Sequence, residues 1–326
     1  MYHLNSSGNI FSGLKEMLEP FSSAKFLIVA DTNVDKLYSD KLAAAIEKET
    51  FKCVIPSGEK SKSVDTAVKI WSALAKYEFT RDDIIIALGG GVVGDIVGFA
   101  AATYLRGIRY INVPTTLLAM VDSSVGGKTG VDIPEGKNLV GAFHKPLFTF
   151  TDIRTLDTLP ESEIKNGIGE IIKYYALTGS KLIHSYFPQI FTERFSLLLQ
   201  ACISFKNELI SEDFNDNGVR QFLNFGHTLG HVIEKHSDYQ IPHGEAVAIG
   251  MCKITKWAEE KGLTEKGTFE TISDLCKDTG LATDYELSAD ELLKSAVHDK
   301  KRRGNILNLV LLRKIGEPFL YESKIS

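Results

Sequence analysis

The sequence predicts an α/β fold: a Rossmann-like N-terminal domain with a parallel sheet, residues 1–159, and a mainly α-helical C-terminal domain, residues 160–326. In the first half, short apolar runs alternate with segments of helical periodicity, which is typical of a parallel sheet covered by helices on both faces. After residues 155–160 this alternation stops, and the remaining chain has mostly helical periodicity. The domain boundary is therefore placed at residue 159.

Three strand–turn–helix units support the predicted sheet. Each begins with an apolar run that is rich in β-branched residues and continues through a polar or glycine-rich turn into a helical pattern. The strands are expected at residues 25–30, 51–55 and 83–88, and the helical patterns at 41–46, 64–77 and from 92 onward. In such a sheet, ligands are expected at the carboxyl ends of the strands.

The third unit carries a glycine-rich turn. Residues 89–94 fit Gly-x-Gly-x-x-Gly, in which glycines allow a pyrophosphate to approach the backbone at a helix N-terminus. The acidic residue usual about 20 positions later is absent, and Asp31, at the end of the first strand, is better placed to hold a ribose. Glycines that only allow close helix packing remain an equally good interpretation.

Two further loops combine glycine with lysine. Lys128 lies in Val-Gly-Gly-Lys-Thr-Gly, and Lys137 follows Gly136. Backbone amides and ammonium groups so arranged favour phosphate binding, although exposed loop lysines are often just solvated.

A histidine-rich stretch lies at residues 220–245, with four of the eight histidines of the chain. His227 and His231 are four apart, which places them on one face of a helix, and His243 is expected on a loop between Pro242 and Gly244. Neutral imidazole is a common zinc ligand, and catalytic zinc keeps one position open. Histidines that hydrogen-bond within a core are the alternative. Thr228 after His227 does not fit a His-Glu-x-x-His protease.

Glu170 is the candidate third ligand. It lies among Ile168, Ile171 and Ile172, where a carboxylate needs a cation or a metal as partner. Lys173 follows on the same helical face, and a surface ion pair of the two is the alternative.

Composition limits the function. The 326 residues suffice for two domains with separate cores, and 44% hydrophobic and 24% charged residues are ordinary for a soluble protein. The net charge of -5 argues against nucleic-acid or membrane-surface partners, so local basic clusters are expected to serve a small anion.

The cysteines and the N-terminus favour a cytoplasmic protein. The four cysteines are far apart without a Cys-x-x-Cys pair, so neither a disulfide framework nor a thiolate zinc site is expected. The first residues lack a basic stretch followed by an apolar one, which argues against a secretory signal. Residues 84–105 are interrupted by Asp95 and glycines, so they are not interpreted as a membrane span.

Several motifs in order resemble the 3-dehydroquinate synthase family, from about Asp31 to Lys301. They are residues 89–95, 114–119, 121–130, 136–138, 169–173 and 224–231. The resemblance implies a lyase, dependent on NAD and a divalent metal (zinc, or cobalt), of the shikimate pathway. It converts 3-deoxy-D-arabino-heptulosonate 7-phosphate into 3-dehydroquinate and phosphate by transient oxidation, phosphate elimination, re-reduction and intramolecular aldol closure.

The resemblance also implies roles for individual residues. Metal ligands would be Glu170, His227 and His243. Residues that act on substrate would be Asp122, Lys128, Asn138, Lys173, Lys206, Arg220, Asn224, His231 and Lys300 or Lys301. NAD would contact Asp31, Asn33, Ser57, Gly58, Glu59, Lys60, Ser61, Lys62, Gly91, Val92, Val93, Gly94, Asp95, Thr115, Thr116, Lys128, Lys137, Thr155, Leu156, Asp157 and Thr158. Arg106 would reach the phosphate site of a neighbouring subunit, which implies a homodimer.

Departures from the family pattern are local. Asp132 stands where many relatives have Asn, and Gly169 where Ala is usual. The alternatives are a metal-dependent polyol dehydrogenase of the glycerol dehydrogenase type, a sibling sugar phosphate cyclase whose substrate lacks the carboxylate, and an inactive scaffold. The first would produce stoichiometric NADH without releasing phosphate, and a substrate panel would identify the second.

Overall fold

The computed structural model describes residues 2–6, 8–214, 216–299 and 306–324. The chain divides into two compact units, Met1–Pro160 and Glu161–Ser326, one residue from the expected boundary. Each unit is described by itself. In the described part of the chain, no helix is long and apolar enough to span a membrane.

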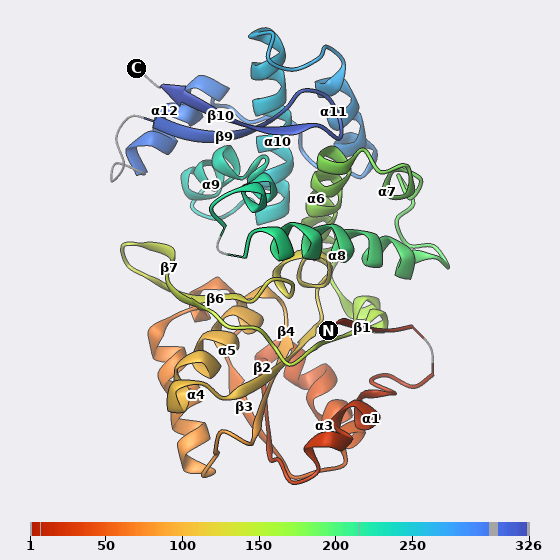
Figure 1. Cartoon of the computed structure of the whole chain (residues 1–326), viewed down its shortest axis with the longest axis vertical. Helices are drawn as coiled ribbons and strands as arrows, with labels where there is room; N and C mark the ends of the chain where they lie inside the picture. The colour runs from red at the N-terminus through yellow and green to blue at the C-terminus, as the bar shows by residue number, and fades with distance from the viewer. Residues whose placement is uncertain (1, 7, 215, 300–305, 325–326) are drawn as a thin grey trace. The chain divides into compact units, whose positions relative to one another are not determined.

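The first unit is built on a parallel sheet, as the sequence predicts (Figure 1). Its six described strands lie in the order β1-β8-β5-β4-β2-β3, and every neighbouring pair is parallel. Their bounds are Tyr2–Asn5 (β1), Phe26–Asp31 (β2), Thr50–Ile55 (β3), Ile84–Gly89 (β4), Arg109–Pro114 (β5) and Thr149–Asp152 (β8). The predicted strands correspond to β2, β3 and β4, in the part of the sheet beside β5 and β8.

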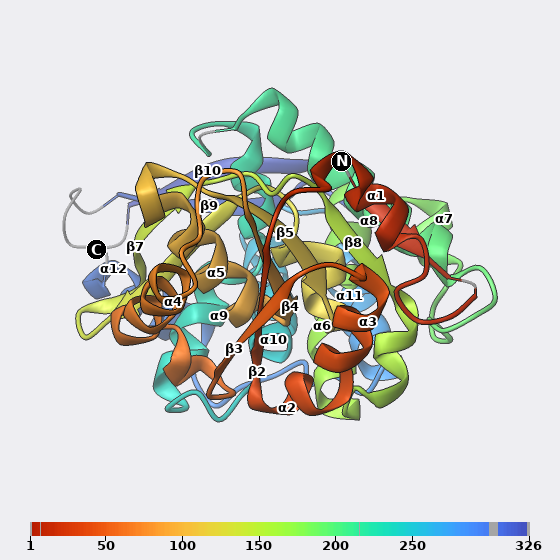
Figure 2. The same cartoon turned by 90° about the horizontal axis from the view of Figure 1, so that it is seen from below.

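Helices cover both faces of this sheet, because the strands bury side chains on both sides. Leu27 and Val29 of β2 pack with α4 and α5, whereas Phe26 and Ile28 pack with α1 and α3. Figure 2 shows these two helix pairs on opposite sides of the sheet. The helices are α1 (Leu14–Leu18), α2 (Thr32–Val34), α3 (Asp40–Ile46), α4 (Val64–Lys76) and α5 (Gly91–Thr103).

The lysine- and glycine-rich loops of the sequence form a β-hairpin instead. Strands β6 (Lys128–Ile133) and β7 (Gly136–Phe143) pair antiparallel, with an irregularity between Val131 and Ile133. Lys128 begins one strand and Lys137 lies within the other. The turns expected from the sequence are therefore corrected to a hairpin. Its glycines lie at facing positions and let the two strands approach closely, since a Cβ at Gly141 would lie 2.2 Å from the Thr129 carbonyl oxygen.

The second unit is mainly helical, as predicted, with one described hairpin. Its helices are α6 (Glu161–Thr178), α7 (Lys181–His184), α8 (Phe195–Glu212), α9 (His227–His236), α10 (His243–Glu260), α11 (Thr268–Asp278) and α12 (Ala289–Asp299). The hairpin joins β9 (Ile306–Leu312) and β10 (Pro318–Lys324) in antiparallel register.

Glycines allow α6, α9 and α10 to meet backbone to backbone. A Cβ at Gly169 of α6 would lie 2.2 Å from the Gly244 carbonyl oxygen of α10, and a Cβ at Gly244 would lie 1.8 Å from the Asn166 carbonyl oxygen. A Cβ at Gly230 of α9 would lie 3.1 Å from the Ala246 carbonyl oxygen. The three helices that carry Glu170, His227 and His243 are therefore held at unusually short range.

Candidate active site

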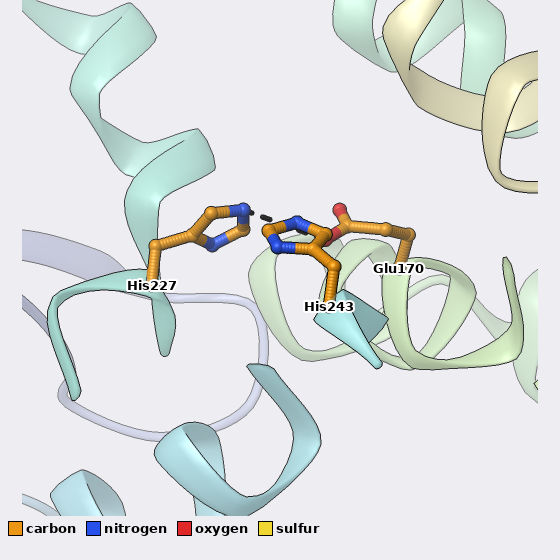
Figure 3. A group of neighbouring side chains, drawn as sticks. All are labelled: Glu170, His227 and His243. Atoms are coloured by element: carbon orange, nitrogen blue, oxygen red, sulfur yellow. Dashed lines mark ion pairs between the residues drawn. The ribbon is translucent and has the colours of Figure 1, made fainter. Parts of the chain in front are cut away.

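Glu170, His227 and His243 converge in the second unit, each from a different helix (Figure 3). The Nε2 atoms of His227 and His243 lie 3.4 Å and 3.6 Å from Oε1 of Glu170. One ligand atom from each residue lies within 4.8 Å of the others, a spacing that could hold a metal ion. Two imidazoles and a carboxylate are a common donor set for catalytic zinc.

The local sequence explains how the two imidazoles are aimed. His227 opens α9 directly after Gly226, whose φ of 78° is a left-handed conformation that favours glycine. Its Nδ1–H donates to the Phe225 carbonyl oxygen at 3.1 Å, so Nε2 is the nitrogen that faces Glu170. His243 is the first residue of α10 and not part of a loop, which corrects the expectation; Pro242 in extended conformation caps the helix.

A buried lysine sits beside the carboxylate. Lys173 lies one helical turn after Glu170, forms an ion pair with it and lies over the Tyr174 ring at 5.2 Å. The side chains of Glu170 and Lys173 are 0% and 1% exposed, so a surface ion pair of the two is excluded. The ammonium offsets the charge of a carboxylate that is shielded from water.

The two imidazoles have opposite pKa shifts. Burial lowers the pKa of His227 to about 3, and the Lys173 charge acts in the same direction. Burial also lowers the pKa of His243, but contacts with the Glu170 and Glu234 carboxylates outweigh it and raise the pKa to about 10. Without a metal, His227 is therefore a neutral imidazole at pH 7, and His243 is a positively charged imidazolium.

His231 lies beside this group. It is exposed, and its ring centroid is 5.5 Å from that of His227 and 6.0 Å from that of His243. With Glu234 and His243 it forms a second set that could hold a metal. In that set Glu234 engages Nδ1 of His243, whereas the first set presents Nε2 of both imidazoles to one buried carboxylate. The ligand assignment stays with the first set, as a prediction.

Other predicted substrate residues occupy the same unit. Lys206 of α8 and Arg220 are buried, and Asn224 is exposed three residues before His227. Arg220 donates from Nη1 to the Phe214 carbonyl oxygen at 2.7 Å, which secures the turn that leads to α9. Their roles toward substrate stay predictions, and Lys300 and Lys301 lie outside the described residues.

The first unit contains a site that fits a dinucleotide. The carboxyl ends of β2, β4 and β5 lie at one edge of the parallel sheet, and α5 begins at Gly91 directly after β4. A Cβ at Gly90 would lie 3.0 Å from Thr116 Cγ2, and one at Gly91 would lie 3.0 Å from Ser123 Oγ. The hydroxyls of Thr115 and Ser123 are buried there without a hydrogen-bond partner among the described residues. A ligand with phosphate and hydroxyl groups fits this edge.

Several predicted cofactor and substrate residues form ion pairs or hydrogen bonds with one another. The buried Lys62 forms an ion pair with Asp95 and donates to Asn138 Oδ1 at 2.6 Å. Burial lowers the pKa of Lys62, but Asp95 outweighs it and raises the pKa, which keeps the side chain charged. Lys137 pairs with Glu59 at 3.4 Å. The 57–62 turn is thereby tied to α5 and to β7.

Asp31 and the Thr155–Thr158 loop have structural contacts beside their predicted roles. Oδ1 of Asp31 caps α2 by accepting from the N–H groups of Asn33 and Val34 at 2.8 Å and 3.1 Å. Tyr38, which the sequence did not single out, lies 2.6 Å through its hydroxyl from Thr158 Oγ1. The remaining predicted cofactor and substrate residues of this unit lie in the 57–62 turn, at the start of α5, between β5 and β6, at the first residue of β6, and in a 3-10 helix at residues 153–158: Ser57, Gly58, Lys60, Ser61, Val92, Val93, Gly94, Asp122, Lys128, Leu156 and Asp157.

Arg106 is exposed in the turn after α5. Leu105 and Arg106 have φ values of 51° and 63°, which are uncommon for residues with side chains. The Leu105 carbonyl oxygen accepts a hydrogen bond from Nε of Arg81 at 2.8 Å, which holds the strained turn. The role of Arg106 at a neighbouring subunit stays a prediction.

Comparisons with known proteins point to one family. A family model described as 3-dehydroquinate synthase N-terminal matches residues 52–166, and one described as 3-dehydroquinate synthase C-terminal matches residues 167–302. A 3-dehydroquinate synthase of Clostridium acetobutylicum is 43% identical over 315 residues, which is 94% of this chain and 88% of the relative. One of Streptococcus pneumoniae is 42% identical over 319 residues, 94% of this chain and 89% of the relative.

Solved structures of related cyclases have the same fold. A 2-deoxy-scyllo-inosose synthase in complex with carbaglucose-6-phosphate, NAD+ and Co2+ has a TM-score of 0.85 at 26% identity, covering 99% of this chain and 92% of that one. A 2-epi-5-epi-valiolone synthase of Streptomyces hygroscopicus with NAD+ and Zn2+ has a TM-score of 0.85 at 27% identity, covering 99% and 93%. A probable glycerol dehydrogenase of Sinorhizobium meliloti, with a TM-score of 0.61 at 15% identity over 93% and 89%, shares the fold alone.

Proposed function

We propose residue-level roles for this chain, which belongs to the 3-dehydroquinate synthase family and is an enzyme of that class. The family reaction eliminates phosphate from 3-deoxy-D-arabino-heptulosonate 7-phosphate and closes the carbocycle of 3-dehydroquinate. The observation that carries the proposal is the convergence of Glu170, His227 and His243 from three helices.

Both implied cofactors fit residues of this chain. Glu170, His227 and His243 would hold the divalent metal, and residues 91–95 with Thr115 and Thr116 would hold the NAD pyrophosphate at the N-terminus of α5. When bound, the metal polarises a substrate oxygen, and NAD accepts and returns a hydride. The structures of two related cyclases contain NAD+ with Co2+ or Zn2+, which supports this pairing.

Buried cations of the second unit are proposed to bind the anionic substrate. Lys206 and Arg220 are almost fully buried, and a buried cation favours a carboxylate or phosphate because that anion replaces lost hydration. Lys173, which the family resemblance marks as a substrate residue, also forms an ion pair with Glu170 and is proposed to balance the charge of that carboxylate. His231, exposed beside the proposed ligands, is assigned to proton transfer with substrate.

A substrate assay tests the reaction. Supplied with the heptulosonate phosphate, catalytic NAD and zinc, the protein should release phosphate and accumulate no NADH, because hydride returns to the product in each turnover. Stoichiometric NADH from glycerol without phosphate release would contradict the proposal. Phosphate release from glucose 6-phosphate or sedoheptulose 7-phosphate in place of the carboxylate-bearing substrate would favour a sibling cyclase.

The assembly and location are part of the proposal. A homodimer is proposed, in which Arg106, exposed in its strained turn, reaches the phosphate site of the second copy. A cytoplasmic location is proposed from the four cysteines, which are buried and form no disulfide. Light scattering at micromolar concentration should give twice the mass of the 36.0 kDa chain.

A further inference from the structure

The ring of His243 is engaged at both nitrogens. Nε2 lies 3.6 Å from Oε1 of Glu170, and Nδ1 lies 3.2 Å from Oε2 of Glu234. Glu234 belongs to α9, the helix that also carries His227 and His231. It is not among the residues that the family resemblance marks, and the sequence shows it only as one acidic residue of an amphipathic helix.

Glu234 is buried, although it carries a carboxylate. The residue is 8% exposed, and a buried carboxylate is costly unless hydrogen-bond donors surround it. The backbone of Glu234 is held as well, because its carbonyl oxygen accepts hydrogen bonds from Tyr239 N–H at 2.7 Å and from the Ser237 hydroxyl at 3.0 Å. The turn that leads from α9 to His243 is therefore folded around Glu234.

The backbone of His243 is fixed independently of its ring. The N–H of Gly244 donates to Asn166 Oδ1 at 2.6 Å, and the missing side chain of Gly244 lets α10 rest against the Asn166 carbonyl oxygen. With the backbone held by α6, rotation of the side chain is the remaining freedom of the imidazole. A hydrogen-bond partner at Nδ1 restricts this rotation.

We infer that Glu234 is a positioning residue for the metal centre: its carboxylate accepts the Nδ1–H of His243 and so presents Nε2 to the ion that Glu170 and His227 share. Outer partners of this kind fix the tautomer and the orientation of a ligating histidine. His227 has a neutral carbonyl of Phe225 in the equivalent place, so the two imidazoles are held by different acceptors. The inference rests on the proposed metal centre and adds a residue that does not touch the ion.

The alternative within the same geometry is that Glu234 itself binds the ion, together with His231 and His243. The two roles respond differently to an isosteric change. The amide oxygen of glutamine still accepts an N–H hydrogen bond, but an amide is a much poorer zinc ligand than a carboxylate.

Zinc affinity of the full-length, metal-free protein, measured by competition with a chromophoric chelator, tests the inference. Glu234→Ala should weaken zinc binding about 10- to 100-fold. Glu234→Gln should stay within about threefold of the wild type, because it keeps the acceptor. Glu260→Ala, which removes an exposed carboxylate at the end of α10, serves as the matched control and should leave the affinity unchanged.

The outcomes separate the two proposals. Wild-type affinity in folded Glu234→Ala, with far-UV circular dichroism as the check, would overturn the positioning role alone. Loss of zinc in Glu234→Gln as complete as in His243→Ala would make Glu234 a ligand and also overturn it. Absence of zinc binding in the wild type would overturn the metal centre and this inference together. If Glu234→Ala fails to fold, the Glu234→Gln result decides.

Discussion

His243 and His227 differ in protonation although both face Glu170. The pKa of His243 is raised to about 10 and that of His227 is lowered to about 3, so at pH 7 in the metal-free protein His227 is a neutral imidazole with one N–H, whereas His243 carries a second proton and a positive charge. A metal must displace that proton, and at pH values below this pKa the proton competes more strongly with the metal as the pH falls. Zinc affinity should therefore rise about tenfold for each pH unit between about pH 6 and 8.

Calorimetry in buffers with different ionisation enthalpies measures the proton directly. About one proton should be released for each zinc bound at pH 7. His243→Ala should lose this signal together with most of the binding. Zinc binding that releases no proton and does not vary with pH would contradict the assignment of His243 as a ligand.

Gly169 has a steric role that its place before Glu170 in the sequence does not reveal. A Cβ at this position would meet the Gly244 carbonyl oxygen at 2.2 Å, so Gly169→Ala should force α6 and α10 apart. We expect a loss of about 1–3 kcal/mol in the free energy of unfolding, as for an overpacked core, and weaker zinc binding. Alanine in an unobstructed helix interior would instead stabilise by about 1 kcal/mol. Urea denaturation gives the sign, and a more stable variant would show that the close contact is absent.

At the scale of single residues, local sequence pattern singles out only those candidate side chains whose neighbours are unusual. Glu170 stands out because it lies among isoleucines, and His227 and His231 stand out because their four-residue spacing places them on one helical face. Glu234 and Asn166 do not, because their importance comes from the return of the chain at His243. The only sequence signal for Glu234 is its position one turn after His231, which many solvent-facing glutamates share.

At the scale of elements, the hairpin β6–β7 is joined to the rest of its unit by a buried charge. Lys62 contacts Asp95 of α5 and Asn138 of β7, and its side chain is 6% exposed. Lys62→Met should therefore destabilise the protein by about 1–3 kcal/mol, since it leaves Asp95 without its closest cation in a partly buried place.

A double-mutant cycle with Asp95→Asn measures this coupling. The double variant should be more stable than the sum of the two single changes predicts, because the second change removes the unbalanced charge. Lys52→Met is the control, because Lys52 pairs with Asp40 at the surface and should contribute less than about 1 kcal/mol. Strictly additive effects of Lys62→Met and Asp95→Asn would show that the ion pair does not hold the hairpin.

The elements were predictable where local pattern and burial agree. The strands β2, β3 and β4 are apolar runs bounded by turns, and all three follow from the sequence. The hairpin was missed because its glycines suggest turns, whereas the structure uses them for close strand contact. The loop expected at His243 is a helix start because Pro242 is extended and Glu245 lies in the first turn, where a carboxylate favours a helix N-terminus.

At the scale of the whole molecule, the proposed dimer can be tested by mixing inactive variants. If Arg106 serves the neighbouring subunit, Arg106→Ala and His243→Ala should each lose activity, but a mixed dimer has one complete site. Random exchange of subunits should restore about a quarter of the wild-type activity, since about half of the dimers are mixed and each has one working site of two.

The subunit-exchange experiment has a control mixture and an outcome that would contradict the proposed role of Arg106. A mixture of His243→Ala with His227→Ala should remain inactive, because both changes affect the same proposed metal centre. If the Arg106→Ala and His243→Ala mixture also stays inactive after verified exchange, Arg106 acts within its own subunit or not at all.

The metal centre as a whole depends on long-range folding that no local pattern contains. Glu170 and His243 are about seventy positions apart, and they meet because α6, α9 and α10 cross at glycines. The family resemblance implies this grouping, whereas residue spacing alone leaves the third ligand open. The contacts that orient the group, from Glu234 and from Asn166, exist only in the folded chain.

Metal content after purification and dialysis tests the central claim most directly. The wild type should retain about one zinc ion for each chain, His243→Ala should retain almost none, and His231→Ala should keep the metal while turnover is lost. Equal metal content in the wild type and in His243→Ala would contradict the account.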